Sequence, residues 1–244
     1  MRQFIDKNGI SKLSPNDKIY PQRIILARKN LPEIYHIGSL TDYDNGISVV
    51  GTRSCSKFGE EFARNLGKEL STHGYKIISG LANGIDTFAH VGCIENNGES
   101  IAILAWFHEL YPSQNKHLLD AILKNGCAIS ENIFKPIKNA RFEFLHRDKL
   151  IASLSDVVVV VESKSKGGSK YTADEAKKNK IPIIKCKTET DDSKLIEGHK
   201  IFIANGAYEA TSPEQVIELI SELKKENITH FQEKIDDYII SKRN

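Results

Sequence analysis

Two strand–loop–helix units follow one another in residues 47–90, which read ISVVGTRSCSKFGEEFARNLGKELSTHGYKIISGLANGIDTFAH. Each unit begins with a short apolar strand, continues through a glycine-containing loop and ends in a helix. The helix of the first unit is marked by Phe58, Phe62, Leu66 and Leu70, which recur at helical spacing. Helix N-termini attract anions, so two of them beside one crevice predict an anion-binding site.

The rest of the chain repeats this alternation of strand and helix. Strands are predicted at residues 100–105, 127–130, 156–162 and 181–185, and helices separate them. The run DVVVVVE at 156–162 has no polar alternation, which is typical of a strand that is buried on both faces at the centre of a parallel sheet. We therefore predict an α/β fold with a doubly wound, mostly parallel sheet and helices on both of its faces.

The domain boundaries follow from the same pattern. Residues 1–45 contain no strong strand and are expected to form a lead-in that packs on the main domain. The main domain is expected to span residues 46–225, and residues 226–244 are predicted to form a charged amphipathic helix.

The composition excludes several classes of protein. A formal net charge of +2 over 244 residues is too small to indicate nucleic-acid binding by itself, so that case must rest on local clusters of charge. The four cysteines are widely spaced and form no CxxC pair, which favours reduced thiols and no metal site. The first residues lack an apolar signal core and no apolar run is long enough to span a membrane, so we expect a cytoplasmic protein.

Basic residues gather in the loops that follow the predicted strands. In a doubly wound sheet these loops lie on one rim, where ligands bind. The basic residues on this rim, which carries few acids, are Arg53, Lys57, Lys135, Lys138, Arg141, Arg147, Lys164, Lys166 and Lys170.

The first loop, GTRSCSKFG, matches neither GxGxxG nor GxxxxGK[ST], so no dinucleotide cofactor and no P-loop triphosphate site is expected. Arg53 suits bidentate recognition of a phosphate, and Gly51, Thr52, Ser54 and Lys57 are candidates to complete the cradle. A surface arginine that caps a turn is the alternative.

The second loop offers Ser79 and Gly80 for close approach of the backbone to a phosphate. Asp86 and His90 lie four residues apart on the next helix. We interpret them as a structural contact, because two ligands do not make a metal site. No catalytic residue is predicted, since the chain has no GxSxG elbow and no nucleophile with an evident base.

Two later stretches extend the rim. RFEFLHR contains Arg141, Phe144 and Arg147, and basic residues interleaved with an aromatic ring are typical of single-strand binding. Phe142 and Phe144 are two residues apart on a helix, so we expect one to be buried and the other exposed.

The second of these stretches, GGSKYTADEA, could hold another phosphate through Gly168, Ser169, Lys170 and Thr172 at the start of a helix expected at 172–179. Solvated lysines on a flexible loop are the alternative there.

Taken in order, these motifs resemble the DNA-processing protein A (DprA/Smf) family over roughly residues 19–220. The stretches that carry the resemblance are VVGTRSCSKFGEEFARNLGKELSTHGYKIISGLANGIDTFAH, YPSQNKHLL, ISE, FEFLHRDKLIASLSDVVVVVES, GGSKYTADEA and ANGA. The resemblance implies an extended Rossmann-like domain that binds single-stranded DNA, dimerises and helps to load the RecA recombinase during transformation or recombination. The winged-helix module of many members is not expected here.

The resemblance also implies roles for individual residues. Arg53 resembles the arginine of the family's G-[ST]-R loop, Ser79 and Gly80 its SG loop, and Arg147 the arginine of its F-x-x-R-N motif. A basic residue and a base-stacking phenylalanine of the family resemble Arg141 and Phe144.

The chain departs from the family pattern in three places. Arg147-Asp148 replaces R-N and puts an acid beside the phosphate path, Trp106-Phe107-His108 replaces a glycine-containing turn, and Lys170-Tyr171 replaces an apolar pair.

Two other hypotheses concern nucleotides. GGSKYTADE is loosely similar to the PGGxGTxxE loop of lysine-decarboxylase-like nucleotide phosphoribohydrolases, with Thr172 and Glu175 at the T-x-x-E spacing. One extra residue before the threonine and the missing proline argue against that activity. A domain that binds a small nucleotide as a signal is the other hypothesis.

Overall fold

The computed structural model describes residues 9–39, 42–136 and 138–225. One sheet of nine strands runs through them in the order β1-β2-β6-β5-β4-β3-β7-β8-β9. The β1–β2 and β2–β6 pairs are antiparallel, and the other neighbouring pairs are parallel. The strands are β1 (Ser11–Leu13), β2 (Ile34–Gly38), β3 (Gly46–Val50), β4 (Lys76–Ser79), β5 (Ser100–Ile103), β6 (Cys127–Ser130), β7 (Val157–Val160), β8 (Ile183–Cys186) and β9 (Tyr208–Ala210).

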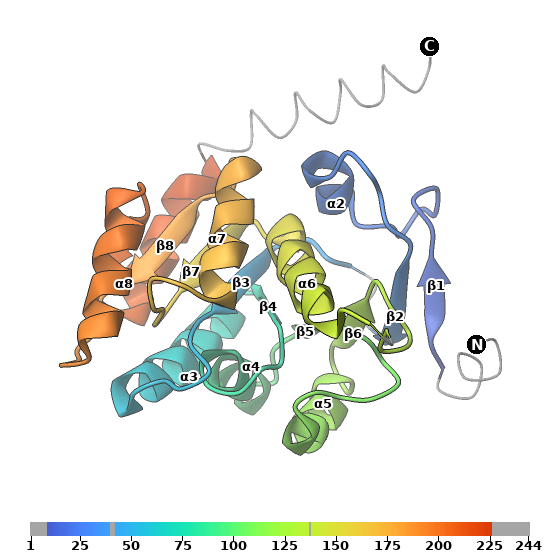
Figure 1. Ribbon diagram of the computed structural model, residues 1–244, viewed down its shortest axis with the longest axis horizontal. Helices are drawn as coiled ribbons and strands as arrows, with labels where there is room; N and C mark the ends of the chain where they lie inside the picture. The colour runs from blue at the N-terminus through green and yellow to red at the C-terminus, as the bar shows by residue number, and fades with distance from the viewer. Residues whose placement is uncertain (1–8, 40–41, 137, 226–244) are drawn as a thin grey trace, which may run out of the picture.

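Helices cover both faces of this sheet, which confirms the predicted doubly wound, Rossmann-like α/β fold (Figure 1). Packed on one face are α2 (Gln22–Ala27), α6 (Ala140–Leu154), α7 (Gly168–Lys178) and α8 (Ser193–Ala204). Packed on the other are α3 (Lys57–Thr72), α4 (Ile85–Glu95), α5 (Lys116–Ile122) and the helical residues 213–225.

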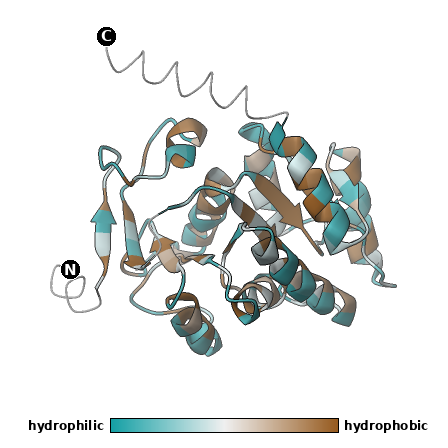
Figure 2. Ribbon diagram, turned by 180° about the vertical axis from the view of Figure 1, so that it is seen from behind, coloured by the Kyte–Doolittle hydropathy of each residue, from teal (hydrophilic) through white to brown (hydrophobic). Residues whose placement is uncertain are grey.

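The valine run forms the middle of the core. Val158 and Val160 face the helices α6 and α7, whereas Val157 and Val159 face α3 and the helical residues 213–225. All four are fully buried. Burial of a valine side chain stabilises a fold by about 1.5 to 3 kcal/mol, so this strand anchors both layers. Figure 2 shows the resulting hydrophobic stripe through the central strands.

Three local predictions are wrong. The segment before residue 46 contributes β1 and β2, although we expected no strong strand there. β2 reads IYHIG, a mixed pattern, and it forms because its backbone pairs with β1 on one side and β6 on the other. The helix α7 begins at Gly168, four residues before the predicted start, and residues 193–204 fold into α8 where no element was assigned. The predicted helix at 226–244 lies outside the described residues.

The strand order reverses between β3 and β7. From β3 the chain crosses through β4 and β5 to β6 on one side, and from β7 it crosses to β8 and β9 on the other. The loops after β3 and β7 therefore leave the sheet in different directions. Ligands of doubly wound sheets bind at such a point, beyond the carboxyl ends of the strands.

Candidate nucleic-acid interface

A crevice opens where the loops after β3 and β7 part. Its cavity measures about 320 Å³. The walls come from residues 50–53 after β3, Ala82 and Asp86 near the start of α4, one side of α6, and residues 167–169 with Thr172 at the start of α7. The predicted residues Gly51, Thr52, Arg53, Arg147, Gly168, Ser169 and Thr172 therefore meet around one cavity.

The N-terminus of α3 is already occupied by a carboxylate of the protein. Glu162, two residues after the end of β7, is fully buried. The Ser56 amide donates to its Oε2 at 2.8 Å, and the Ser56 hydroxyl donates to its Oε1 at 2.6 Å. The Glu162 backbone oxygen accepts from the Thr52 amide at 2.7 Å. These hydrogen bonds hold the first loop in place. The negative charge of Glu162 also interacts favourably with the positive end of the α3 dipole, so an internal carboxylate already takes the place of an external anion there.

Asp86 lies in the first turn of α4 and holds the loop that precedes this helix. Its Oδ2 accepts from the Gly80 amide at 3.1 Å and from the Ala82 amide at 3.4 Å. Burial raises the pKa of Asp86 to about 6, although the positive charge of Arg147 acts in the opposite direction. The expectation that the N-terminus of α3 is open to an external anion is therefore wrong, and at α4 an internal carboxylate stands in the first turn.

Arg147 crosses the floor of the crevice between two carboxylates. Its Nη1 lies 3.5 Å from Asp86 Oδ2, and its Nε lies 3.3 Å from Asp148 Oδ1. Only 7% of Arg147 is exposed. A Cβ atom on Gly80 would lie 1.3 Å from Arg147 Nη1, so the arginine can follow this path only because residue 80 is a glycine.

Asp148 faces the first turn of α7. A Cβ atom on Gly168 would lie 2.8 Å from Asp148 Oδ2. Burial raises the pKa of the Asp148 carboxyl, and the nearby Arg147 and Arg53 oppose that shift. The start of each of these three helices, α3, α4 and α7, thus has an internal carboxylate beside it.

Beside the crevice lies a shallow groove that carries exposed cationic and aromatic groups. It borders Arg53, Asn83, Tyr111, Phe144 and Arg147 and holds a cavity of about 30 Å³. Arg53 is exposed, and its Cζ lies 5.7 Å from the centroid of the Phe144 ring. The Cζ of Arg147 lies 5.9 Å from the same centroid. Both guanidinium groups therefore lie within cation–π distance of one aromatic ring.

We call Trp106, Tyr111 and Phe144 the aromatic platform. The Phe144 ring lies edge-on to Trp106, with 5.3 Å between centroids, and edge-on to Tyr111, with 5.6 Å. Trp106 is buried and its indole N–H donates to the Glu109 carbonyl at 2.6 Å, whereas Tyr111 is 58% exposed. The platform thus has one ring held in place by its surroundings, Trp106, and one ring open to solvent, Tyr111. An exposed ring of this kind is what stacking of a nucleobase requires.

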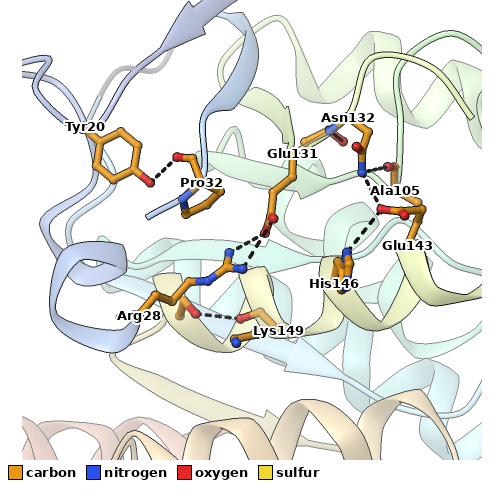
Figure 3. A network of polar contacts seen from close by, with 11 residues as sticks. Tyr20, Arg28, Pro32, Ala105, Glu131, Asn132, Glu143, His146 and Lys149 are labelled. Carbon is orange, nitrogen blue, oxygen red and sulfur yellow. Dashed lines mark hydrogen bonds and ion pairs between the residues drawn. The ribbon is translucent and has the colours of Figure 1, made fainter. Parts of the chain in front are cut away.

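A polar network holds the first turns of α6, which carry the platform's Phe144 (Figure 3). Asn132 donates from its amide to Glu143 Oε2 at 2.6 Å, and His146 Nδ1 lies 3.4 Å from the same oxygen. At the end of β6, Glu131 forms an ion pair with Arg28, which directly follows α2. Asn132 in the loop after β6 therefore holds the first turn of α6, and the Arg28 pair ties the lead-in segment to the start of the same loop.

Comparisons with known proteins identify the family. The sequence profile described as DNA recombination-mediator protein A matches residues 11–221. The chain belongs to this family.

Its members include curated relatives with clear sequence identity to the chain. Protein Smf of Synechocystis sp. is 32% identical over 213 residues, which cover 84% of this chain and 52% of that protein. DNA processing protein DprA of Streptococcus pneumoniae is 33% identical over 202 residues, covering 77% of this chain and 69% of that protein. The chain spans about half the length of the first relatives that it matches: 52%, 58% and 46% of the Synechocystis, Bacillus subtilis and Escherichia coli proteins.

Solved structures of the family share the fold. DprA of Streptococcus pneumoniae superposes with a TM-score of 0.78 at 28% identity, over 89% of this chain and 77% of that chain. DNA processing protein A of Helicobacter pylori, described for its single-stranded DNA binding mode, gives 0.73 at 26% identity over 89% and 96%. A molybdenum cofactor binding protein of Rippkaea orientalis, at 23% identity and a TM-score of 0.53, shares the fold alone.

Several residues that the family resemblance or the motifs singled out lie away from the crevice or are otherwise occupied. The buried Ser79 hydroxyl donates to the Val49 carbonyl at 2.6 Å, so it links the neighbouring strands β4 and β3. Lys170 forms an ion pair with Asp174 and borders a separate cavity beside β8. Lys57, Ser54 and Arg141 are exposed but do not border the crevice or the groove.

Two expectations about neighbouring side chains have mixed outcomes. Phe142 is 43% exposed and Phe144 is partly buried, which follows the predicted direction. Asp86 and His90 do not pair as predicted: Asp86 binds Arg147 and the loop amides, while His90 Nδ1 lies 2.7 Å from Ser100 Oγ.

Sequence reasoning missed Glu162 and Tyr111. The sequence places Glu162 at the end of the predicted valine strand and assigns Tyr111 no role. An acidic residue at the end of an all-apolar run is the sequence signal that could have singled out Glu162.

Neither a membrane span nor a metal cluster is found in the part of the chain that the structure describes. None of its helices is long and apolar enough to cross a bilayer. No three His, Cys, Asp or Glu side chains among the described residues are grouped to hold a metal ion.

Proposed function

We propose that this chain binds single-stranded DNA along the groove beside the crevice and catalyses no reaction. At most positions of the strand, binding depends little on which base is present. The observation that carries the proposal is that exposed Arg53 lies beside the aromatic platform, with Tyr111 exposed at its edge. Cations that hold phosphates next to a ring that stacks a base are the common elements of single-strand binding. The Helicobacter pylori relative, described for its single-stranded DNA binding mode, supports the same function.

The internal carboxylates favour a strand over a free nucleotide. A nucleoside di- or triphosphate needs several hydrogen-bond donors to its phosphates in one enclosed place. The carboxylates of Glu162, Asp86 and Asp148 already lie at the helix starts around the crevice, where such phosphates would bind. Arg53 is exposed instead, and a solvent-facing arginine can contact one phosphate of a passing backbone.

The phosphoribohydrolase hypothesis receives no support from the geometry. Thr172 borders the crevice, and its hydroxyl donates to the Gly168 carbonyl at 3.2 Å. Glu175, which that hypothesis needs in the same site, is absent from the crevice walls and accepts from Lys178 Nζ at 2.5 Å.

The finer biological role extends this proposal. By its membership of the family, we propose that the chain is a cytoplasmic homodimer that protects single strands and delivers them to a RecA-type recombinase.

Fluorescence anisotropy tests the binding function. A labelled oligo-dT strand is titrated with the protein at low salt and then challenged with unlabelled single-stranded and double-stranded competitors. We expect saturable binding that the single-stranded competitor displaces at much lower concentration. Absence of binding at low salt, or equal displacement by duplex, would overturn the proposal.

A further inference from the structure

The deep part of the crevice has an electrostatic character opposite to that of the groove. Asp86 and Asp148 lie there with a single buried cation, Arg147, between them. Arg53, the other cation on the cavity wall, is exposed. With both carboxyls ionised, the interior carries one more negative than positive charge. A phosphate would be repelled from this depth, because charges interact strongly where water is excluded.

Asp148 has unused hydrogen-bonding capacity. Its residue is 6% exposed and borders the cavity. Arg147 Nε approaches Oδ1 at 3.3 Å, but no hydrogen-bond donor among the described residues reaches Oδ2. A carboxylate oxygen accepts up to two hydrogen bonds, so Asp148 keeps acceptor capacity on the wall of the cavity. The cavity therefore suits a group that brings donors to Asp148.

The walls and the volume of the cavity also suit a flat aromatic ring. Val50, Ala82 and Ile151 provide apolar walls, and a volume of about 320 Å³ lies within the usual range for small-molecule sites. Arg53, Ala82 and Arg147 border both the crevice and the groove. A strand whose phosphate contacts Arg53 thus passes the mouth of the crevice, and one of its bases can enter.

We propose that the crevice takes one nucleobase of the bound strand and prefers guanine, whose N1–H and N2–H groups donate to the carboxylate of Asp148. This inference rests on the proposed single-strand binding. Guanine presents two adjacent donors on its Watson–Crick edge, which match the two oxygens of a carboxylate. Thymine presents one N–H between two carbonyl oxygens, and a carboxylate repels those carbonyls. Asp148 thereby selects one base, while the groove accepts the rest of the strand.

Anisotropy with single-base variants of one strand tests the preference. The strands are twelve thymidines, and the same strand with a central guanine, a central inosine, which lacks the N2 amino group, or a central abasic site. We expect the guanine strand to bind about 5- to 150-fold more tightly than the thymidine strand, the range for a good bidentate contact to a base. The inosine strand should fall between them.

Asp148→Asn and Asp174→Asn form a matched pair of variants. Both remove one negative charge, but Asp174 pairs with Lys170 on the side of α7 away from the crevice. The guanine-to-thymidine affinity ratio should fall to near one in Asp148→Asn, since an amide offers one acceptor, and stay unchanged in Asp174→Asn. Because the readout is a ratio within each variant, a general change in charge or stability does not move it.

The outcomes separate the two proposals. Equal affinity of the wild-type protein for guanine and thymidine strands overturns this inference and leaves the proposed function intact. An inosine strand that binds as tightly as the guanine strand, or a ratio that survives Asp148→Asn, overturns it as well. If none of the strands binds, the proposed function itself fails.

Discussion

Gly80 leads to the strongest prediction about the architecture of the site. In Gly80→Ala, the new methyl group would lie 1.3 Å from Arg147 Nη1 and 2.9 Å from Asp86 Oδ2. The guanidinium must leave its place, so Asp86 and Asp148 lose the cation that stands between them. Loss of one partner from a buried ion pair costs about 3 to 5 kcal/mol, and we expect a loss of unfolding free energy in this range.

A double-mutant cycle assigns this cost to the clash. Urea unfolding is measured for the wild type, Gly80→Ala, Arg147→Ala and the double variant. In the Arg147→Ala background the larger overlap no longer exists, so Gly80→Ala should cost only about 1 kcal/mol. The two changes should therefore be strongly non-additive. If Gly80→Ala costs the same in both backgrounds, or is neutral in the wild type, the described path of Arg147 is refuted.

Three further predictions concern the platform, the first loop and pH. Tyr111→Leu should weaken binding of an oligo-dT strand by about 1 to 3 kcal/mol and leave binding of an abasic strand unchanged, because its exposed ring stacks a base. Tyr208→Leu, at a ring 45% exposed on β9, is the matched control, and equal effects in anisotropy titrations would contradict the assignment. Glu162→Gln should lower the unfolding free energy by about 1 to 3 kcal/mol, since the buried acceptor of the Ser56 amide and hydroxyl loses its charge; unchanged urea unfolding would show that this pair does not hold the loop. Burial raises the pKa of Asp86 from 3.8 to about 6, so the native state holds a proton that the unfolded state releases between these values. As pH falls from 7 to 4, the wild type should therefore gain stability relative to Asp86→Asn in urea unfolding, and a pH-independent difference would contradict the raised pKa.

The central part of the fold could be predicted from the sequence because its signals are local. Five valines in succession require burial on both faces, and a glycine-containing loop between strand and helix repeats in residues 47–90. β2 carries no such signal. Its residues Tyr35 and His36 interrupt the apolar pattern, and the strand exists because β6 offers it an edge to pair with.

The candidate site was predictable in its position but not in its electrostatics. Arg53 and Arg147 follow from motif and spacing, and the structure brings both to the groove. The roles of Glu162 and Asp148 depend on burial and on the close approach of distant segments, which no local pattern contains. Lys170 was predicted to bind phosphate, but α7 begins before it, and its side chain forms an ion pair with Asp174 four residues along the helix.

We propose above all that exposed Arg53 holds a phosphate of a bound single strand. The most direct test is the salt dependence of oligo-dT affinity for the wild type and Arg53→Ala, measured by anisotropy over a series of salt concentrations. Each phosphate neutralised on a single strand contributes about 0.7 to the slope of log K against log salt. We predict that Arg53→Ala binds more weakly and that its slope is smaller in magnitude by about 0.7. An unchanged affinity and slope would contradict the claim.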